Sequence, residues 1–250
     1  MLTRVTAATE STNRKGRTMA NLEGVIPGWV DGKWEVPEWS FDGGPALIIN
    51  HMQVGIAGTG EFSGAPFAQE KKQMERLGTI AQQKKLIAAF RERNLPVIFM
   101  SVIPNPINYL PKWGFIFEMT GKVGPKGLLN NPKTAELGEV IPEMGRLPGE
   151  PLFYHTGHSP LTGNHLMEYL RQFNVRDIVL TGWTAHSTLY NSLLQFTNHW
   201  YSVVVPRDAT GAPDRDMDCA DIVLSKMMRM WGLVTTVSDV IAHLPARQSP

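Results

Sequence analysis

The chain has 250 residues, which is enough for one large α/β domain or two small ones. Its formal net charge of +1 supplies no field for a polyanion, so we do not expect nucleic-acid binding. The single cysteine excludes an internal disulfide. No apolar run approaches the roughly 18 residues that a membrane span needs, so we expect no membrane association.

The N-terminal part of the chain differs from the rest in composition. Residues 1–20 lack the apolar segment of a secretory signal, so we predict a disordered tail and a cytoplasmic protein, although a transit peptide or a true start at Met19 would fit as well. Residues 21–44 form a tryptophan-rich arm with several prolines and glycines. Its tryptophans need cover, either from their own domain or, as we favour, from a neighbouring subunit in a homo-oligomer (dimer or tetramer).

From residue 45 onward, short apolar runs alternate with amphipathic segments. We predict helices over 71–93, over the stretch around 166–173, from 184 to about 196, over 214–230 and at the C-terminus. The buried strands are predicted at 45–50, 97–102, 151–155, 177–182, 201–206 and 233–238. This alternation predicts a single α/β domain over 45–245, with a doubly wound, mostly parallel, six-stranded sheet flanked by helices.

Three of the predicted strands end in polar residues. His51 and Gln53 follow the first strand, and His155 ends the third. The fourth strand runs into a Gly182–Trp183 turn, after which a helix opens at Thr184. Because the carboxyl ends of parallel strands meet at one edge of a sheet, we expect these residues to converge on one site.

The turn after the fourth strand leads the chain onto a helix N-terminus. Its backbone N–H groups can hold a carboxylate, a phosphate or a developing oxyanion. We therefore predict that Thr184, Ala185 and His186 bind the substrate or the oxyanion, although His186 could instead cap the helix. Trp183 either stacks on a planar substrate or fills the core.

Residues 104–150 are irregular and rich in proline and glycine. A loop of this length in a compact domain is usually functional or a subunit contact. Its aromatic residues, Trp113 and Phe117 among them, either wall an apolar substrate pocket or cover the sheet.

Four segments, in this order and spacing, resemble the isochorismatase-like hydrolase superfamily over about residues 45–240. They are ALIINHMQ (46–53), LPGEPLFYHTGHSPLTGNHL (147–166), IVLTGWTAHSTLYNSL (178–193) and VVVPRDA (203–209). The resemblance implies a cysteine hydrolase with an Asp/Lys/Cys triad. At the three triad positions this chain has His51, His155 and Thr188, so the usual thiolate chemistry is not available. The lone Cys219 lies in the next helix, where we expect it in the core.

The true isochorismatase subgroup is similar in an Ala-His pair within the turn, here Ala185–His186, and also lacks a working cysteine. The resemblance implies that such enzymes cleave a vinyl ether with the triad aspartate as proton donor. A histidine acid at His51 would have to replace that aspartate, which its ordinary titration near neutral pH allows.

Several interpretations of the centre stay open. Thr188 is either a nucleophile activated by a histidine or a helix-start residue bonded to the backbone. His51 and His155 either transfer protons, or bind a metal together with His158 or His186, or survive in a lost active site. By position, the backbone around Thr184 and Thr188 inherits the oxyanion hole of the family.

We therefore expect a hydrolase of a small, cyclic or aromatic substrate, with a His51/His155/Thr188 centre and neither metal nor cofactor. Cleavage of an amide or related C–N bond is favoured over cleavage of a vinyl ether or an ester. The alternatives are a non-catalytic homologue that binds a ligand or partner in the old pocket, and a metal-dependent enzyme.

Overall fold

The computed structural model describes residues 11–12, 18–19, 29–30, 33–58, 70–102, 134–155 and 159–247. The chain divides into two units, Met1–Trp39 and Ser40–Pro250. The described residues of the first unit form two short antiparallel pairs, β1 (Ser11–Thr12) with β2 (Thr18–Met19) and β3 (Trp29–Val30) with β4 (Lys33–Trp34). Residues 40–44, predicted as the end of the arm, belong to the second unit.

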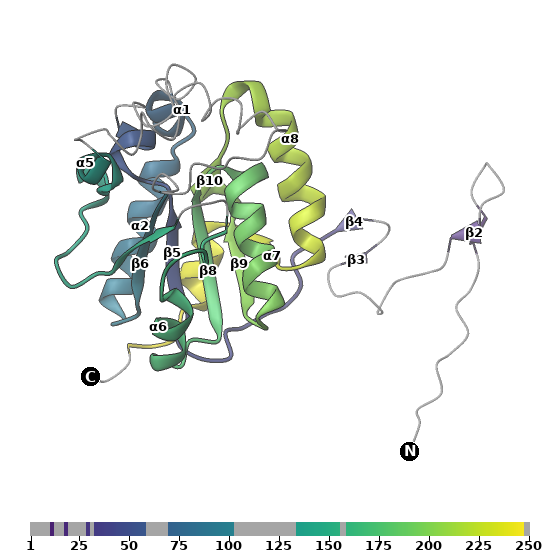
Figure 1. Cartoon of the computed structure of the whole chain (residues 1–250). Coiled ribbons are helices and arrows are strands. Elements are labelled where there is room, and N and C mark those ends of the chain that lie inside the picture. Colours follow the sequence, from purple (N-terminus) through teal and green to yellow (C-terminus); the bar gives the residue numbers. More distant parts are fainter. Residues whose placement is uncertain are drawn as a thin grey trace. The chain divides into compact units, whose positions relative to one another are not determined.

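A parallel sheet forms the centre of the second unit (Figure 1). Its strands are β5 (Ala46–Asn50), β6 (Val97–Val102), β7 (Leu152–His155), β8 (Asp177–Trp183), β9 (Ser202–Pro206), β10 (Thr210–Gly211) and β11 (Leu233–Thr235). The order is β11-β9-β8-β5-β6-β7, and all five pairings are parallel. The predicted doubly wound sheet is confirmed. It gains β10, a two-residue strand parallel to β8 that is too short to leave a pattern in the sequence.

Helical segments connect the strands. They are η1 (Val54–Gly58), α1 (Glu70–Arg76), α2 (Thr79–Glu92), α5 (Thr134–Gly138), η3 (Pro142–Met144), α6 (Leu166–Gln172), η4 (Ala185–Leu189), α7 (Tyr190–Asn198), η5 (Arg207–Ala209), η6 (Asp214–Asp216), α8 (Met217–Ile222), η7 (Val223–Met227), η8 (Met228–Met230) and α9 (Val237–His243). Within the described ranges, none of these helices has the length and apolar character to cross a membrane.

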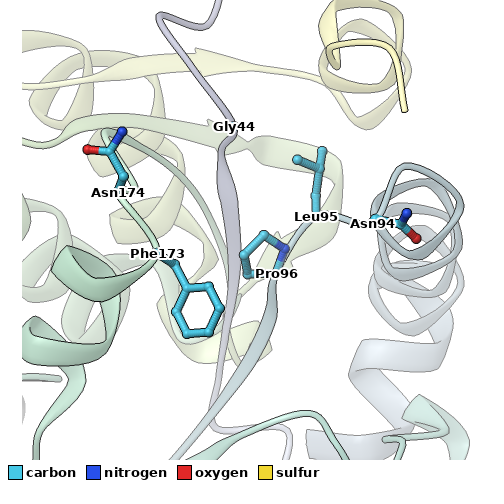
Figure 2. A pocket seen from close by; sticks show the side chains of 6 residues that line it. All are labelled: Gly44, Asn94, Leu95, Pro96, Phe173 and Asn174. Atoms are coloured by element: carbon cyan, nitrogen blue, oxygen red, sulfur yellow. The ribbon is translucent and has the colours of Figure 1, made fainter. Parts of the chain in front are cut away.

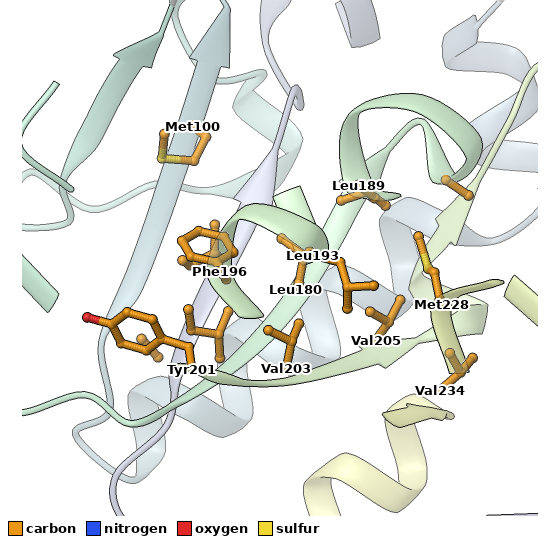
Figure 3. Close-up of a cluster of buried hydrophobic side chains, with 14 of the residues drawn as sticks. Met100, Leu180, Leu189, Leu193, Phe196, Tyr201, Val203, Val205, Met228 and Val234 are labelled. Carbon is orange, nitrogen blue, oxygen red and sulfur yellow. The ribbon is translucent and has the colours of Figure 1, made fainter. Parts of the chain in front are cut away.

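Helices cover both faces of the sheet. On one face α6, α7 and the α8–η8 segment pack on side chains of the central strands, and Figure 3 shows part of this cluster around Leu180, Leu193, Phe196 and Met228. On the other face α2 contacts β5, β6 and β8, and it packs beside α9. Both faces of the sheet are therefore covered by helices, as is usual for a parallel sheet.

Two predicted helices are less regular than expected. The helix predicted over 71–93 is interrupted, because Gly78 adopts the left-handed conformation (φ 74°) between α1 and α2. The helix predicted over 214–230 consists of the successive segments η6, α8, η7 and η8. The expectation that Cys219 lies in the core is wrong, because this residue is exposed. Ala220, Leu224 and Met228 form the buried stripe of this segment, and Cys219, one position earlier, points away from that stripe.

The strand order reverses between β5 and β8. The chain runs outward from β5 through β6 to β7 on one side, and from β8 through β9 to β11 on the other. In open α/β sheets, ligands bind outside the carboxyl ends of the strands at this switch point. His51 and the turn after Trp183 lie there.

A pocket of about 210 Å³ lies at the other end of the sheet (Figure 2). It is lined by Gly44, Asn94, Leu95, Pro96, Phe173 and Asn174. Gly44 and Pro96 precede β5 and β6, so the pocket sits at the amino ends of these strands, away from the switch point.

Substitution of Gly182 tests the close approach of β5 and β8. It pairs with Asn50, has φ 125°, and a Cβ built on it would lie 2.1 Å from the Asn50 carbonyl oxygen. We expect Gly182→Ala to lower the free energy of unfolding by about 3 kcal/mol or more. Urea denaturation measures this loss. Gly149→Ala is the matched control, because its Cβ would meet nothing within 4 Å. Equal stability of the two variants would contradict the close packing.

Candidate active site

His51 and His155 meet at the carboxyl edge of the sheet. His51 follows β5 and His155 ends β7, and their side chains reach each other although β6 lies between these strands. Their Nε2 atoms are 2.9 Å apart, and the rings are stacked with centroids 5.0 Å apart. His155 is fully buried and His51 is 7% exposed. The convergence predicted for these two residues is therefore present.

The backbone of His51 is unusual. Its φ of 57° lies in the left-handed region, which costs a residue with a Cβ about 1–2 kcal/mol. The N–H of His51 donates to the carbonyl of Met100 (2.9 Å), which continues the β5–β6 ladder to this residue. Such uncommon conformations gather at functional sites, where the surrounding structure holds them.

The short contact restricts the protonation of the two rings. A hydrogen bond between two Nε2 atoms needs one N–H donor and one lone pair. Two imidazolium rings would place two donors against each other and two positive charges side by side, so this contact excludes the doubly charged pair. The pair can therefore pass through two states, one neutral and one with a single positive charge, as a proton-transfer group must.

The turn after β8 contains a cis peptide bond between Trp183 and Thr184. The first hydrogen bond of η4 runs from the N–H of Leu189 to the carbonyl of Thr184 (3.0 Å). The N–H groups of residues 185–188 precede that bond, and such groups form the electropositive end of a helix. The hydroxyls of Thr184 and Ser187 bond each other at 2.5 Å. Thr188 is 4% exposed and lies within this turn.

Gln53, predicted to bind substrate, makes three hydrogen bonds to the backbone. Its Oε1 accepts from the N–H of Val102 (2.8 Å), and its Nε2 donates to the carbonyls of Val102 (3.0 Å) and Leu137 (3.2 Å). The side chain thus joins the end of β6 to α5, and a substrate would compete with these bonds. Asp208 has a structural role, because its Oδ1 accepts from the N–H of Val237 (2.8 Å).

Trp183 is buried at the start of the turn, and His186 is half-buried. Trp183 is 1% exposed and its ring packs against Gly211. Burial lowers the pKa of His186, and the Asp216 carboxylate, 3.8 Å from its Nε2, opposes this shift. His186 is therefore neutral at neutral pH. The predicted pocket residues Trp113 and Phe117, and the alternative metal ligand His158, lie outside the described residues.

Glu70 is a further candidate residue near this edge, and it belongs to none of the motifs in the sequence. It begins α1, its side chain is fully buried, and burial raises its pKa to about 8. The Trp183 indole N–H lowers the pKa in part, as does the charge of Arg215. A signal for this burial exists in the sequence, because Glu70 shares a helical face with Met74, four residues on, which is also buried.

Several buried polar atoms near this edge make no hydrogen bond within the part of the chain that the structure describes. They are Asn50 Oδ1, both carboxyl oxygens of Glu70, Ser101 Oγ, Trp183 Nε1 and His186 Nδ1. Buried polar groups without partners are uncommon in proteins. Groups of this kind, gathered at the ends of β5, β6 and β8, can pair with the polar atoms of a substrate.

Comparison with known proteins agrees with this fold. The model of the isochorismatase domain family matches residues 45–239. The structure of an isochorismatase family protein from Burkholderia thailandensis has 25% sequence identity and a TM-score of 0.64, covering 84% of this chain and 99% of that protein. A cysteine hydrolase from Pseudomonas syringae has 19% identity and a TM-score of 0.66, with coverages of 84% and 97%. N-carbamoylsarcosine amidase from Thermoplasma acidophilum has 19% identity and a TM-score of 0.54, with coverages of 77% and 96%.

The hydrogen bonds of the Gln53 side chain predict that its replacement lowers the stability of the protein. Gln53→Leu leaves three backbone groups of Val102 and Leu137 without their side-chain partner in a buried place. We expect the free energy of unfolding to fall by about 3 kcal/mol, measured by urea denaturation. Gln172→Leu, at an exposed position of α6, is the control and should change it by less than about 0.5 kcal/mol. A loss in Gln53→Leu no larger than in the control would show that these bonds contribute nothing to stability.

The buried Glu70 predicts a decline in stability with rising pH. Its pKa is about 8 in the folded protein against an ordinary value of 4.5, so between these values the native chain holds a proton that the unfolded chain has released. The free energy of unfolding should therefore fall between pH 5 and 8, by up to roughly 4 kcal/mol. Glu70→Gln should remove this decline, as urea denaturation at several pH values would reveal. The same pH slope in both proteins would contradict the assignment.

Proposed function

Since this chain belongs to the isochorismatase family of hydrolases, we propose that it hydrolyses a C–N bond of a small cyclic or aromatic substrate with a centre of His51, His155 and Thr188. The observation that supports this proposal most is the 2.9 Å contact between the two imidazole Nε2 atoms. Two imidazoles in contact at the switch point of the sheet are suited to proton transfer, which supports the role that we propose for them.

The proposed reaction begins with attack on the substrate carbonyl. The Thr188 hydroxyl, or a water molecule in its place, forms a bond to the carbonyl carbon and gives its proton to the imidazole pair. The pair then carries one positive charge, which two rings in contact can share. The negative charge that develops on the carbonyl oxygen is held by backbone N–H groups of residues 184–188.

Collapse of the tetrahedral intermediate breaks the C–N bond. The proton held by the imidazole pair passes to the leaving nitrogen, so the amine departs neutral. If Thr188 attacks, an acyl-threonine ester remains, and a water molecule activated by the same pair hydrolyses it to the acid. These steps use no cofactor, and they return both histidines and Thr188 to their starting state.

The choice of a C–N bond rests on chemistry and on one similar structure. N-carbamoylsarcosine amidase from Thermoplasma acidophilum has the same fold, and its name describes cleavage of a C–N bond. In this chain the neutral imidazole of His186 adds an uncharged polar group at the start of the turn. Such a group suits the uncharged N–H and C=O groups of an amide, a ureide or a cyclic imide.

Substitution of the centre tests the proposal. We expect ammonia or amine release from a panel of primary amides, N-carbamoyl compounds and cyclic imides, with esters and vinyl ethers as the competing substrates. His51→Asn and His155→Gln should each lower kcat/KM by roughly 100-fold or more, because proton transfer is lost. Asparagine tolerates the left-handed backbone of residue 51 better than most residues do. Thr188→Val should lower kcat to a similar degree if the hydroxyl attacks, and far less if water attacks.

Cys219→Ser is the control for this experiment. Cys219 lies on α8 with its side chain exposed, and it takes no part in the proposed steps. Its variant, and the native enzyme treated with iodoacetamide, should keep full activity. Loss of activity on alkylation would favour a thiol enzyme. No turnover of any panel member, together with tight binding of one, would favour the non-catalytic homologue, and activity lost on treatment with a chelator would favour a metal enzyme.

A further inference from the structure

Glu70 lies near Trp183, the residue that precedes the turn on which the proposed mechanism depends. It opens α1, a helix at the end of the sheet where the strands terminate (Figure 1). Its side chain is 0% exposed, so it has no access to water. A carboxyl group buried in this way is costly unless it is neutral or paired, and its retention calls for an explanation.

The indole of Trp183 is the polar group that acts most strongly on Glu70. The carboxyl oxygens of Glu70 and Nε1 of Trp183 are buried and make no hydrogen bond within the part of the chain that the structure describes, and the indole N–H is close enough to lower the pKa of the carboxyl group. Trp183 is itself 1% exposed and is held against Gly211. It is also the residue directly before Thr184, so its side chain is attached at the start of the turn.

We propose that Glu70 is a positioning residue, which as a neutral acid sets the orientation of Trp183 and thereby of the residue 184–188 turn, and which disturbs this turn when it ionises. This role rests on the proposed function, because it matters for catalysis only if the turn holds the oxyanion. It is distinct from the proton-transfer role of the histidine pair, since Glu70 acts through Trp183.

Burial and the charges around Glu70 determine the pH at which its carboxyl group ionises. Burial raises its pKa to about 8, Arg215 pulls the pKa down, and Asp216 pushes it up. The elements η1 and α2 pack on α1. Of these, η1 carries no charged residue, and none of the charged residues of α2 is among the groups that shift the pKa of Glu70. Lys71 of α1 itself bonds Glu143. A neutral carboxyl can donate or accept beside the indole, whereas a carboxylate can only accept. Ionisation therefore draws the indole N–H and the Arg215 guanidinium toward Glu70.

Nuclear magnetic resonance of the full chain tests this without a substrate. In ¹H–¹⁵N spectra recorded from pH 6.5 to 9.5, the indole N–H of Trp183, assigned through Trp183→Phe, should shift with a midpoint near 8. The backbone amides of residues 184–188 should shift with the same midpoint. Glu70→Gln should abolish both titrations while leaving these resonances near their neutral-pH positions in the native protein. His186 does not interfere, because its pKa is lowered and its titration falls on the acidic side.

Two further variants complete the design. Glu75→Gln, at an exposed position on the same helix, should leave both titrations unchanged. Glu70→Leu, which supplies no polar atom, should shift the 184–188 amides at every pH, whereas Glu70→Gln keeps them in place.

Two results would overturn the proposal. One is a Trp183 indole resonance that does not move between pH 6.5 and 9.5. The other is an indole that titrates while the 184–188 amides stay still. None of these measurements requires turnover. A failure of this proposal can therefore be distinguished from a failure of the proposed hydrolase function.

Discussion

The pairing of β5 with β8 is the constraint on which the candidate site depends. These two strands begin the two halves of the sheet, and at their carboxyl ends Gly182 lies directly against the backbone of Asn50. Only a residue without a Cβ fits there. Because the strands are held this close, the residue after Asn50 and the turn after Gly182 lie at the same edge of the sheet. The position of His51 beside the Thr184–Thr188 turn is thus a consequence of backbone packing.

On this scaffold the chain carries a set of side chains unlike the Asp/Lys/Cys triad that the family resemblance implies. An aspartate and a lysine form an ion pair, whereas two histidines in contact carry at most one positive charge. The 2.9 Å contact turns two separate bases into one unit with a shared proton. In the mechanism that we propose, an oxygen replaces the thiolate as the attacking atom, and such an oxygen needs a base for activation. The histidine pair is the base that we propose for this step.

Much of this arrangement could be predicted from the sequence. The apolar runs located the strands of the parallel sheet, and the rule that sites lie at carboxyl strand ends was enough to place His51 and His155 together. The geometry of their contact could not be predicted, because it depends on the left-handed backbone of His51, which no local pattern signals. The break at Gly78 and the exposure of Cys219 were missed for a similar reason, since helical periodicity alone does not reveal where a helix is interrupted or which neighbour of a buried residue faces outward. Glu70 was missed because a charged residue at the start of a polar helix normally faces water.

The proposed mechanism depends on the hydrogen bond between the rings of His51 and His155. A scalar coupling across this bond detects it most directly. In protein labelled with ¹⁵N-histidine, a bond of 2.9 Å between the Nε2 atoms of His51 and His155 should give a resolved ¹⁵N–¹⁵N coupling. The coupling should vanish in His155→Gln, and the two rings should take up a single proton between them as the pH falls. Absence of the coupling, together with independent protonation of the two rings, would show that His51 and His155 do not act as one hydrogen-bonded unit.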